Sequence, residues 1–211
     1  YLTSNHRKML DEPEEIIEGL RIMLTLFENA KGYICIEDNK PDCILKMKEL
    51  VKDIPRMEVK ELLTKYPQGG ERTLIYATTG REINSSMLPA DVGCVVDNVD
   101  TVAAIYRAVI LGEPVMDKVI TVTGDGIRTP KNFRVYTGTD LAEVVEAAGG
   151  LKEGVSKVIA GGPMMGFAMY DLHVPCTKTT SACLCLEEDP VSKARQTACI
   201  NCGRCVSVCP G

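Results

Sequence analysis

Apolar residues in the first 110 positions alternate between helical and strand-like spacing. Residues 11–15 (Asp-Glu-Pro-Glu-Glu) offer a capping aspartate, a proline and acids suited to the positive end of a helix dipole. Apolar residues then continue at helical spacing, at Ile16, Leu20, Met23 and Phe27. The pattern next predicts a strand over 33–36, a helix over 41–52 and a strand over 56–62. Helices alternating with short apolar strands indicate a parallel α/β structure.

The same reasoning extends to residue 113. The loop 66–71 (Tyr-Pro-Gln-Gly-Gly-Glu) is turn-rich and leads into a helix over 72–79, which Gly80 ends. A brief strand is predicted over 94–96. Residues 98–101 (Asn-Val-Asp-Thr) then lead into a further helix, whose apolar face is Val102, Ile105, Tyr106 and Val109.

The pattern changes near residue 114. Strands are predicted over 118–123 and 132–136, with Gly124 to Gly126 as the turn between them. A helix over 141–148 and a strand over 157–160 follow. One helix on a small mixed sheet is an α+β module, which we expect to end near residue 175.

Composition and charge exclude several classes of protein. The chain has 211 residues, 45% of them hydrophobic and 25% charged, as in ordinary globular proteins. Its longest apolar runs fall short of the roughly 20 residues that span a bilayer, and no signal peptide is recognisable. The net charge of −5 disfavours a nucleic-acid partner. Hydrolytic catalysis is not supported, because the two histidines, His6 and His173, sit in no triad or metal motif.

Cysteines near the end of the chain carry the clearest chemistry. The run Cys199-x2-Cys202-x2-Cys205-x3-Cys209-Pro210 matches that of bacterial ferredoxins, whose thiolates bind [4Fe–4S] clusters. Structural zinc, the main alternative, favours two cysteine pairs a dozen or more residues apart. A disulfide pair is the other alternative. The remaining six cysteines are interpreted as small buried apolar residues: Cys35, Cys43, Cys94, Cys176, Cys183 and Cys185.

The cysteine run implies two clusters. In two-cluster ferredoxins the fourth cysteine binds the other cluster, so Cys199, Cys202 and Cys205 would share a cluster that Cys209 does not ligate. Both clusters then need cysteines from elsewhere. We therefore expect these 211 residues to be part of a longer chain, cut at both ends, and to bind clusters poorly or not at all.

A set of motifs along the chain carries a family resemblance. They are 1–3 (Tyr-Leu-Thr), 36–41 (Ile-Glu-Asp-Asn-Lys-Pro), 66–71, 79–82 (Thr-Gly-Arg-Glu), 88–93 (Leu-Pro-Ala-Asp-Val-Gly), 119–124 (Val-Ile-Thr-Val-Thr-Gly), 161–166 (Gly-Gly-Pro-Met-Met-Gly) and the cysteine run. In these residues the chain resembles the C subunits of Rnf electron-transport complexes, which are membrane-attached bacterial ferredoxin:NAD⁺ oxidoreductases.

The resemblance implies three modules. Residues 1–113 would be the later part of a Rossmann-like flavin- and NADH-binding α/β domain, similar to the flavin subunit of respiratory complex I. Residues 114–175 would be an α+β β-grasp module of the soluble-ligand-binding type. Residues 176–211 would begin an α-helical two-cluster ferredoxin domain.

The resemblance also implies cofactors and site residues. FMN and NAD(H) would bind beside Gly69, Gly70 and Glu71, with Asn98 and Thr101 approaching the flavin, and two [4Fe–4S] clusters would follow. On the residues alone, Gly69-Gly70 is interpreted as a turn and Asn98 as a helix cap, and only the resemblance gives them a functional role. The family's glycine-rich flavin loop belongs upstream of Tyr1, so we expect weak flavin binding and no activity from these residues alone.

The function implied is electron transfer between NAD(H), flavin and clusters, with no catalytic side chain assigned. Partners would be the membrane subunits of the complex and, indirectly, ferredoxin, at the cytoplasmic side of the membrane, although the fragment itself is expected to be soluble. Two alternatives remain: a flavin and iron–sulfur reductase of a soluble system such as corrinoid reduction, and a ligand-binding scaffold without redox chemistry. The 161–166 loop lacks a P-loop lysine, and it is interpreted as structural.

Overall fold

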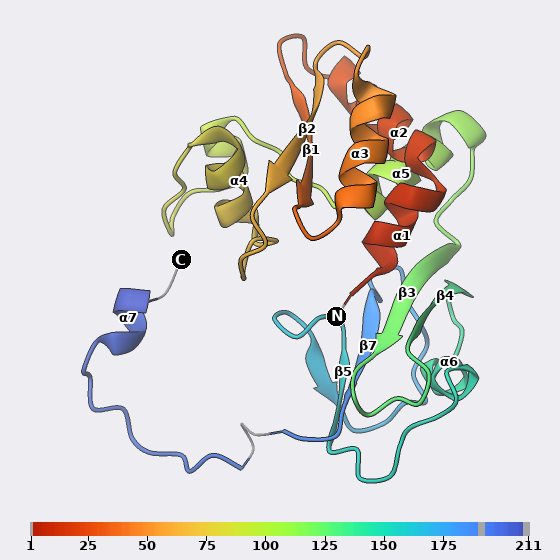
Figure 1. Ribbon diagram of the computed structural model, residues 1–211, viewed down its shortest axis with the longest axis vertical. Coiled ribbons are helices and arrows are strands. Elements are labelled where there is room, and N and C mark those ends of the chain that lie inside the picture. Colours follow the sequence, from red (N-terminus) through yellow and green to blue (C-terminus); the bar gives the residue numbers. More distant parts are fainter. Residues whose placement is uncertain (1, 190–192, 209–211) are drawn as a thin grey trace. The chain divides into compact units, whose positions relative to one another are not determined.

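The computed structural model describes residues 2–189 and 193–208. The chain divides into two compact units (Figure 1). The parallel unit consists of Met9–Leu111 with the residues from Ala198 onward. The mixed-sheet unit consists of the residues up to Lys8 with Gly112–Thr197.

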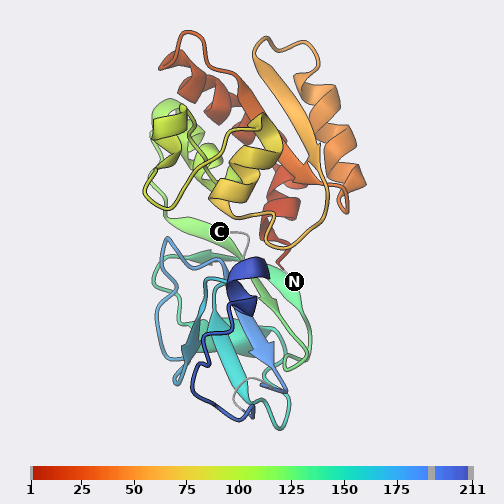
Figure 2. The same cartoon turned by 90° about the vertical axis from the view of Figure 1, so that its left-hand side faces the viewer.

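The parallel unit is built on two parallel strands, β1 (Gly32–Glu37) and β2 (Met57–Leu62), paired from Gly32 opposite Met57 to Glu37 opposite Leu62. Its helices are α1 (Ser4–Asp11, which begins in the other unit), α2 (Pro13–Thr25), α3 (Pro41–Val51), α4 (Glu71–Thr79) and α5 (Val99–Tyr106). The turns η1 (Pro89–Val92) and η2 (Arg107–Leu111) complete it. Helices α3 and α4 lie on opposite sides of the strands (Figure 1, Figure 2).

The core of the parallel unit lies between its strands and helices. Every second residue of β1 is buried, as a half-covered strand requires, and Ile34 and Ile36 pack with Met47 of α3. Helices α2 and α5 approach closely at Gly19, where a Cβ atom would overlap the carbonyl oxygen of Val102. Glycine at this position is therefore what allows the two helices to touch.

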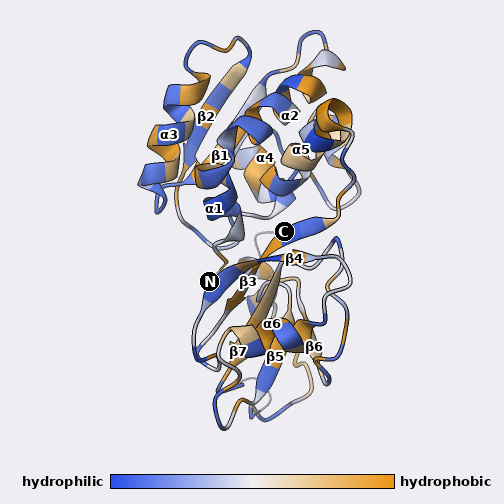
Figure 3. Ribbon diagram, turned by 90° about the vertical axis from the view of Figure 1, so that its right-hand side faces the viewer, coloured by the Kyte–Doolittle hydropathy of each residue, from blue (hydrophilic) through white to orange (hydrophobic). Residues whose placement is uncertain are grey.

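The mixed-sheet unit has five strands in the order β4-β3-β7-β5-β6. Strand β3 (Asp117–Thr123) pairs antiparallel with β4 (Lys131–Tyr136) and parallel with β7 (Ala182–Leu186). Strand β5 (Lys157–Ala160) pairs antiparallel with β7 and with β6 (Phe167–Met169). Helix α6 (Leu141–Ala147) packs with the sheet (Figure 3), and the shared core includes Ile120, Val122, Val144, Cys183 and Cys185.

Most predicted elements are present within a residue or two of their expected ends. Within the described residues, α1, β6, β7 and the short α7 (Arg204–Val208) had no counterpart among the predicted elements. The sheet continues to Leu186, beyond the end near residue 175 that the sequence predicted for this module, because β7 pairs with β3 and β5. The predicted strand over 94–96 is wrong, since this segment has no ladder partner in the described parts of the chain.

The residues after β7 contain one further helix within the described part, the short α7 (Arg204–Val208). The two-cluster ferredoxin module therefore stays a prediction. Among the helices of residues 2–189 and 193–208, none is both long enough and apolar enough to cross a bilayer.

Candidate functional site

The start of helix α4 holds three of the predicted flavin-site residues. Gly70 is the N-cap residue, with extended backbone angles (φ −69°, ψ 133°), and Glu71 is the first helical residue. The loop before them is fixed by Thr73, whose hydroxyl donates to the carbonyl oxygens of Pro67 at 2.7 Å and Gly70 at 2.8 Å. Gly69 and Glu71 are exposed. This helix start presents backbone N–H groups and one carboxylate to solvent.

The start of helix α5 holds the other two. The Asn98 side-chain oxygen accepts the backbone N–H of Asp100 at 2.9 Å, so Asn98 acts as the N-cap. Thr101, one turn later, is exposed. The helix is anchored by Val102 and Ala103, which are buried against α2. The capping interpretation of Asn98 is thus confirmed by this hydrogen bond.

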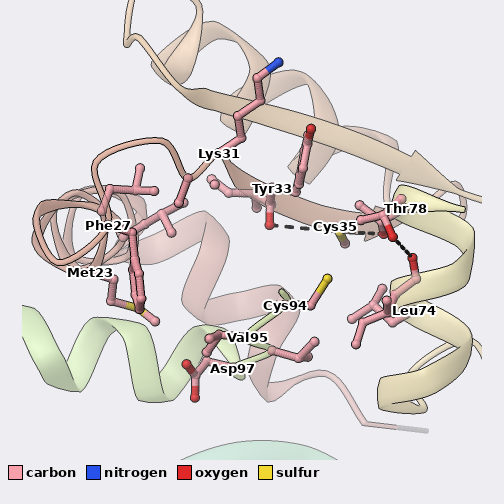
Figure 4. A pocket seen from close by; sticks show the side chains of 18 of the residues that line it. Met23, Phe27, Lys31, Tyr33, Cys35, Leu74, Thr78, Cys94, Val95 and Asp97 are labelled. Atoms are coloured by element: carbon pink, nitrogen blue, oxygen red, sulfur yellow. Dashed lines mark hydrogen bonds between the residues drawn. The ribbon is translucent and has the colours of Figure 1, made fainter. Parts of the chain in front are cut away.

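Beyond these two helix starts lies a cavity of about 900 Å³ within the parallel unit (Figure 4). The following turns of α4 (Leu74, Ile75, Thr78) and α5 (Val99, Val102) line it. Gly69, Gly70, Glu71, Asn98 and Thr101 are not in its lining. The structure therefore places the predicted residues at the heads of two helices that flank the cavity.

Two cysteines outside the cluster run face this cavity. The sequence predicts that all six cysteines outside the run are buried. Cys35 on β1 and Cys94 after η1 are only partly buried and both line the cavity (Figure 4). The Cys35 thiol lies 3.4 Å from the hydroxyl of Thr78. Burial raises the pKa of the Cys35 thiol above its ordinary value, which keeps it protonated at neutral pH. The other four cysteines are fully buried, as predicted.

Polar groups of the cavity wall largely bind the protein itself. The Arg81 guanidinium donates to the carbonyl oxygens of Val92 at 2.6 Å and Gly93 at 3.2 Å, and it lies 3.6 Å from the Cys94 sulfur. The Thr79 hydroxyl donates to the Ile75 carbonyl at 2.8 Å. The cavity is consequently a largely apolar space. Sequence reasoning missed it, because residues far apart in the chain line it.

Three cysteines of the predicted cluster run are described. Cys199, Cys202 and Cys205 are free and exposed, and the Asn201 N–H points to the Cys199 sulfur at 3.4 Å. Gly203 has φ +73°, a left-handed conformation that glycine adopts readily. Within the described residues no group of three metal-binding side chains is assembled. Cys209, the fourth predicted ligand, lies outside the described residues.

Two domain families match this chain. Residues 1–107 match the Nuo51 FMN-binding domain, and residues 119–168 match the SLBB domain.

Two curated relatives, both C subunits of ferredoxin:NAD(+) oxidoreductase complexes, match the chain over its full length. The chain is 43% identical, over 210 residues, to that of the proton-translocating complex of Clostridium ljungdahlii, covering 100% of this chain and 46% of that protein. It is 41% identical to that of the Na(+)-translocating complex of Acetobacterium woodii, covering 100% and 47%. The chain thus spans about half the length of these two relatives.

Among solved structures, the NAD⁺-reducing [NiFe]-hydrogenase in its H2-reduced state is similar in fold. The TM-score is 0.67 at 18% identity, over 89% of this chain and 39% of that one. At this identity the likeness concerns the fold alone, and it supports a mixed α/β architecture with the two matched domains in this order.

Proposed function

This chain belongs to the Nuo51 FMN-binding domain family and to the C subunits of ion-translocating ferredoxin:NAD⁺ oxidoreductase complexes, and on that premise we propose that it is part of a subunit that passes electrons between NAD(H), FMN and iron–sulfur clusters. The observation that carries the proposal is that two C subunits match this chain over its entire length. The ferredoxin-type cysteine run supports it independently of that match.

FMN would bind at the heads of α4 and α5. Backbone N–H groups at a helix start suit the phosphate or ring edge of a flavin. The space beside Gly69 is open, since an added Cβ there would meet nothing within 4 Å, and a ligand can therefore approach its backbone closely. Glu71 and Thr101 are exposed and can bind polar groups of flavin or nicotinamide, and Asn98 offers its amide nitrogen. When bound, the flavin supplies the conversion between hydride and single-electron transfer, while these residues orient it.

The clusters would be held by Cys199, Cys202 and Cys205, with Cys209 serving a second cluster. These thiols fit the donor chemistry of a [4Fe–4S] cluster, since they are free and exposed on one short segment. The Asn201 N–H beside the Cys199 sulfur is the kind of hydrogen bond that tunes a cluster potential. The ligands for the remaining positions must come from outside the described residues.

The partners we propose are the membrane subunits of the complex and, through them, ferredoxin. The subunit would then work as a peripheral protein at the cytoplasmic side of the membrane. The names of two relatives, which are subunits of proton- and Na(+)-translocating complexes, support the part of this proposal that concerns other subunits.

The experiment that tests the proposal is anaerobic iron and sulfide analysis, with optical and EPR spectra, of the subunit at the length of its relatives. About eight irons and eight sulfides, with absorbance bleached by dithionite, are expected for two [4Fe–4S] clusters. Cys202→Ser should remove about half of the iron. Cys94→Ser, at a partly buried thiol outside the run, is the control and should remove none. Zinc in place of iron, or no metal after reconstitution, would refute the proposal.

Flavin binding is tested by FMN titration of the same protein. Glu71→Gln and Thr101→Val change exposed side chains, so both variants should fold and bind FMN or NADH more weakly. Asn98→Asp retains the oxygen that caps α5 and removes the amide nitrogen, which separates a role in flavin binding from a role in helix capping.

A further inference from the structure

Two left-handed residues shape the turn between the first and third cysteines of the cluster run. Asn201 has φ +54° and Gly203 has φ +73°, one on each side of Cys202. Glycine adopts this conformation freely, and asparagine is one of the few other residues that visit it routinely. In this turn Asn201 lies against the sulfur of Cys199.

Both the backbone and the side chain of Asn201 meet the Cys199 sulfur. The backbone N–H donates to the sulfur at 3.4 Å. The side-chain oxygen lies 3.5 Å from the sulfur and accepts from the thiol. Among the residues that the structure describes, the sulfurs of Cys202 and Cys205 have no hydrogen-bonding side chain. Asn201 therefore singles out one of the three described thiols.

The side-chain amide of Asn201 can serve the sulfur in two ways. A free thiol donates its proton to the amide oxygen, as it does here. A cysteine sulfur bound to iron is a thiolate, which has no proton and only accepts. The amide group carries an acceptor and a donor side by side, so a half-turn of its plane replaces the oxygen by the NH2 group. The same side chain then donates to the sulfur.

A donor on a ligand sulfur favours the reduced form of an iron–sulfur cluster. Reduction adds a negative charge, which the sulfurs share, and hydrogen bonds to a more negative acceptor are stronger. Hydrogen bonds to the sulfurs are among the features that set cluster reduction potentials. A neutral amide at Cys199 would therefore raise the potential of the cluster that this cysteine ligates.

We propose that the side-chain amide of Asn201 donates a hydrogen bond to the iron-bound Cys199 sulfur and raises the reduction potential of that cluster alone. The inference rests on the proposed function, because it requires the clusters to be present. The second cluster, which Cys209 would serve, gains nothing from this contact. Asn201 thus gives the electron a preferred site within the pair of clusters.

The competing explanation is that Asn201 only shapes the turn. Asparagine suits a positive φ, and its side chain would then have no effect on the potential. A glycine, such as Gly203 two residues later, would satisfy the turn with less strain. The contact between the amide and the sulfur favours the electronic role, since glycine could not provide it.

Redox titration followed by EPR, on the complete gene product with its clusters reconstituted, tests the proposal. Asn201→Gly keeps the left-handed turn and removes the amide. The reduction equilibrium of the cluster ligated by Cys199 should shift about tenfold toward the oxidised form, which lowers its potential by about 59 mV. The other cluster is the internal control and should shift less than about twofold. Cys199→Ser identifies the EPR signal of the cluster concerned.

Two further variants separate the role of the amide from that of the turn. Asn201→Asp keeps the size of the side chain and its tolerance of positive φ, but it places a carboxylate at the sulfur. Its potential should fall further than that of Asn201→Gly. Ser207→Ala is the matched control in the same run, because the Ser207 hydroxyl donates to the Arg204 carbonyl oxygen at 2.9 Å. Both clusters of this variant should stay within about twofold of the unmodified protein.

Pulsed EPR of the reduced protein detects the hydrogen bond directly. Asparagine that carries 15N only in its side-chain amide should give a hyperfine coupling to the cluster, and Asn201→Gly should abolish it. A missing coupling, an unmoved potential, or equal shifts of both clusters would overturn the proposal. Loss of the cluster from both Asn201 variants would assign a structural role and overturn it as well. A full iron content with an unmoved potential leaves the proposed function standing, whereas an iron-free subunit refutes both.

Discussion

Strands β7 and β1 have similar sequences and different surroundings. Strand β7 (Ala-Cys-Leu-Cys-Leu) lies between β3 and β5, and its first four residues are buried. Strand β1 begins with Gly-Tyr-Ile-Cys-Ile, has β2 on one edge, and lines a cavity of about 900 Å³ with the other. Uncharged strands of this kind usually have a neighbouring strand on each edge. In the mixed-sheet unit the described residues provide both neighbours of β7, whereas in the parallel unit they provide only one neighbour of β1.

The difference predicts where the chain tolerates change. A closely packed sheet interior has no room for added atoms, and it loses contacts when atoms are removed. Side chains beside an existing cavity lose fewer contacts on truncation. The following experiments test the close packing of the mixed-sheet unit, and two of them compare it with the cavity wall of the parallel unit.

The largest effect is expected for Gly124→Ala in the mixed-sheet unit. Gly124 has φ +111°, and a Cβ there would overlap the backbone carbonyl of Cys185 in β7. Backbone strain and overpacking together should lower the free energy of unfolding of this unit by about 4 kcal/mol. Urea unfolding followed by residue-resolved NMR measures the loss for each unit.

Gly138→Ala is the matched control, with a similar φ of +100° and no atom within 4 Å of the added Cβ. Only the strain of the backbone conformation remains, about 1 kcal/mol. If the two variants lose the same stability, close packing of Gly124 against β7 is not what limits this position.

A smaller difference is expected between Ile120→Ala and Leu74→Ala. Ile120 on β3 is fully buried, so its truncation should cost about 3 kcal/mol. Leu74 on α4 is partly buried at the cavity wall, and its truncation enlarges a space that already exists, so about 1 kcal/mol or less is expected. Equal losses in urea unfolding would indicate that the cavity is closed in solution.

Thiol labelling of the native chain compares the two units without mutation. Cys94 faces the cavity and should react with maleimide at least about 100-fold faster than Cys183 and Cys185, which are fully buried and need unfolding to react. Because burial raises the pKa of Cys35, its rate should keep rising with pH above 9. Peptide mass spectrometry separates these sites from the exposed cysteines of the run. Rapid labelling of Cys183 would contradict the close packing of β7 between β3 and β5.

Local sequence predicted the elements that depend on neighbours in the chain. Strand β1, helix α3 and strand β2 follow from apolar spacing, and Gly80, with φ +74°, ends α4 as predicted. Strand β7 was missed because its partners β3 and β5 lie about 60 and 25 residues earlier in the chain.

The candidate site was predictable only in part. The motifs around Gly69 to Glu71 and Asn98 to Thr101 are local, and the structure places both at helix starts. The cavity that α4 and α5 flank combines residues from α2, β1, α4 and the segment 93–97, and no local pattern indicates such a combination. The strand prediction over 94–96 failed although the segment is apolar, because it has no ladder partner among the described residues.

The smallest effect concerns pH, and it is expected in the mixed-sheet unit. The Nδ1 atom of His173 lies 3.0 Å from a carboxylate oxygen of Asp140, whose other oxygen caps α6 by accepting the Ala142 N–H at 3.0 Å. The hydrogen bond to Asp140, and then the charges of Asp140 and Asp171, raise the pKa of His173. The same hydrogen bond lowers the pKa of Asp140, so the carboxylate is charged throughout the neutral range.

The sign of the pH dependence follows from these directions. A raised folded-state pKa stabilises the fold fully below the ordinary value of 6.5, and this contribution is lost as pH rises through the higher folded-state value. The urea midpoint of the mixed-sheet unit should therefore fall slightly between pH 6 and pH 9. His173→Gln should remove that fall, and Asp140→Asn should do the same while retaining an oxygen to cap α6. The side chain of His173 is 76% exposed, so solvent keeps the effect small. A fall that persists in His173→Gln would assign it to another titrating group.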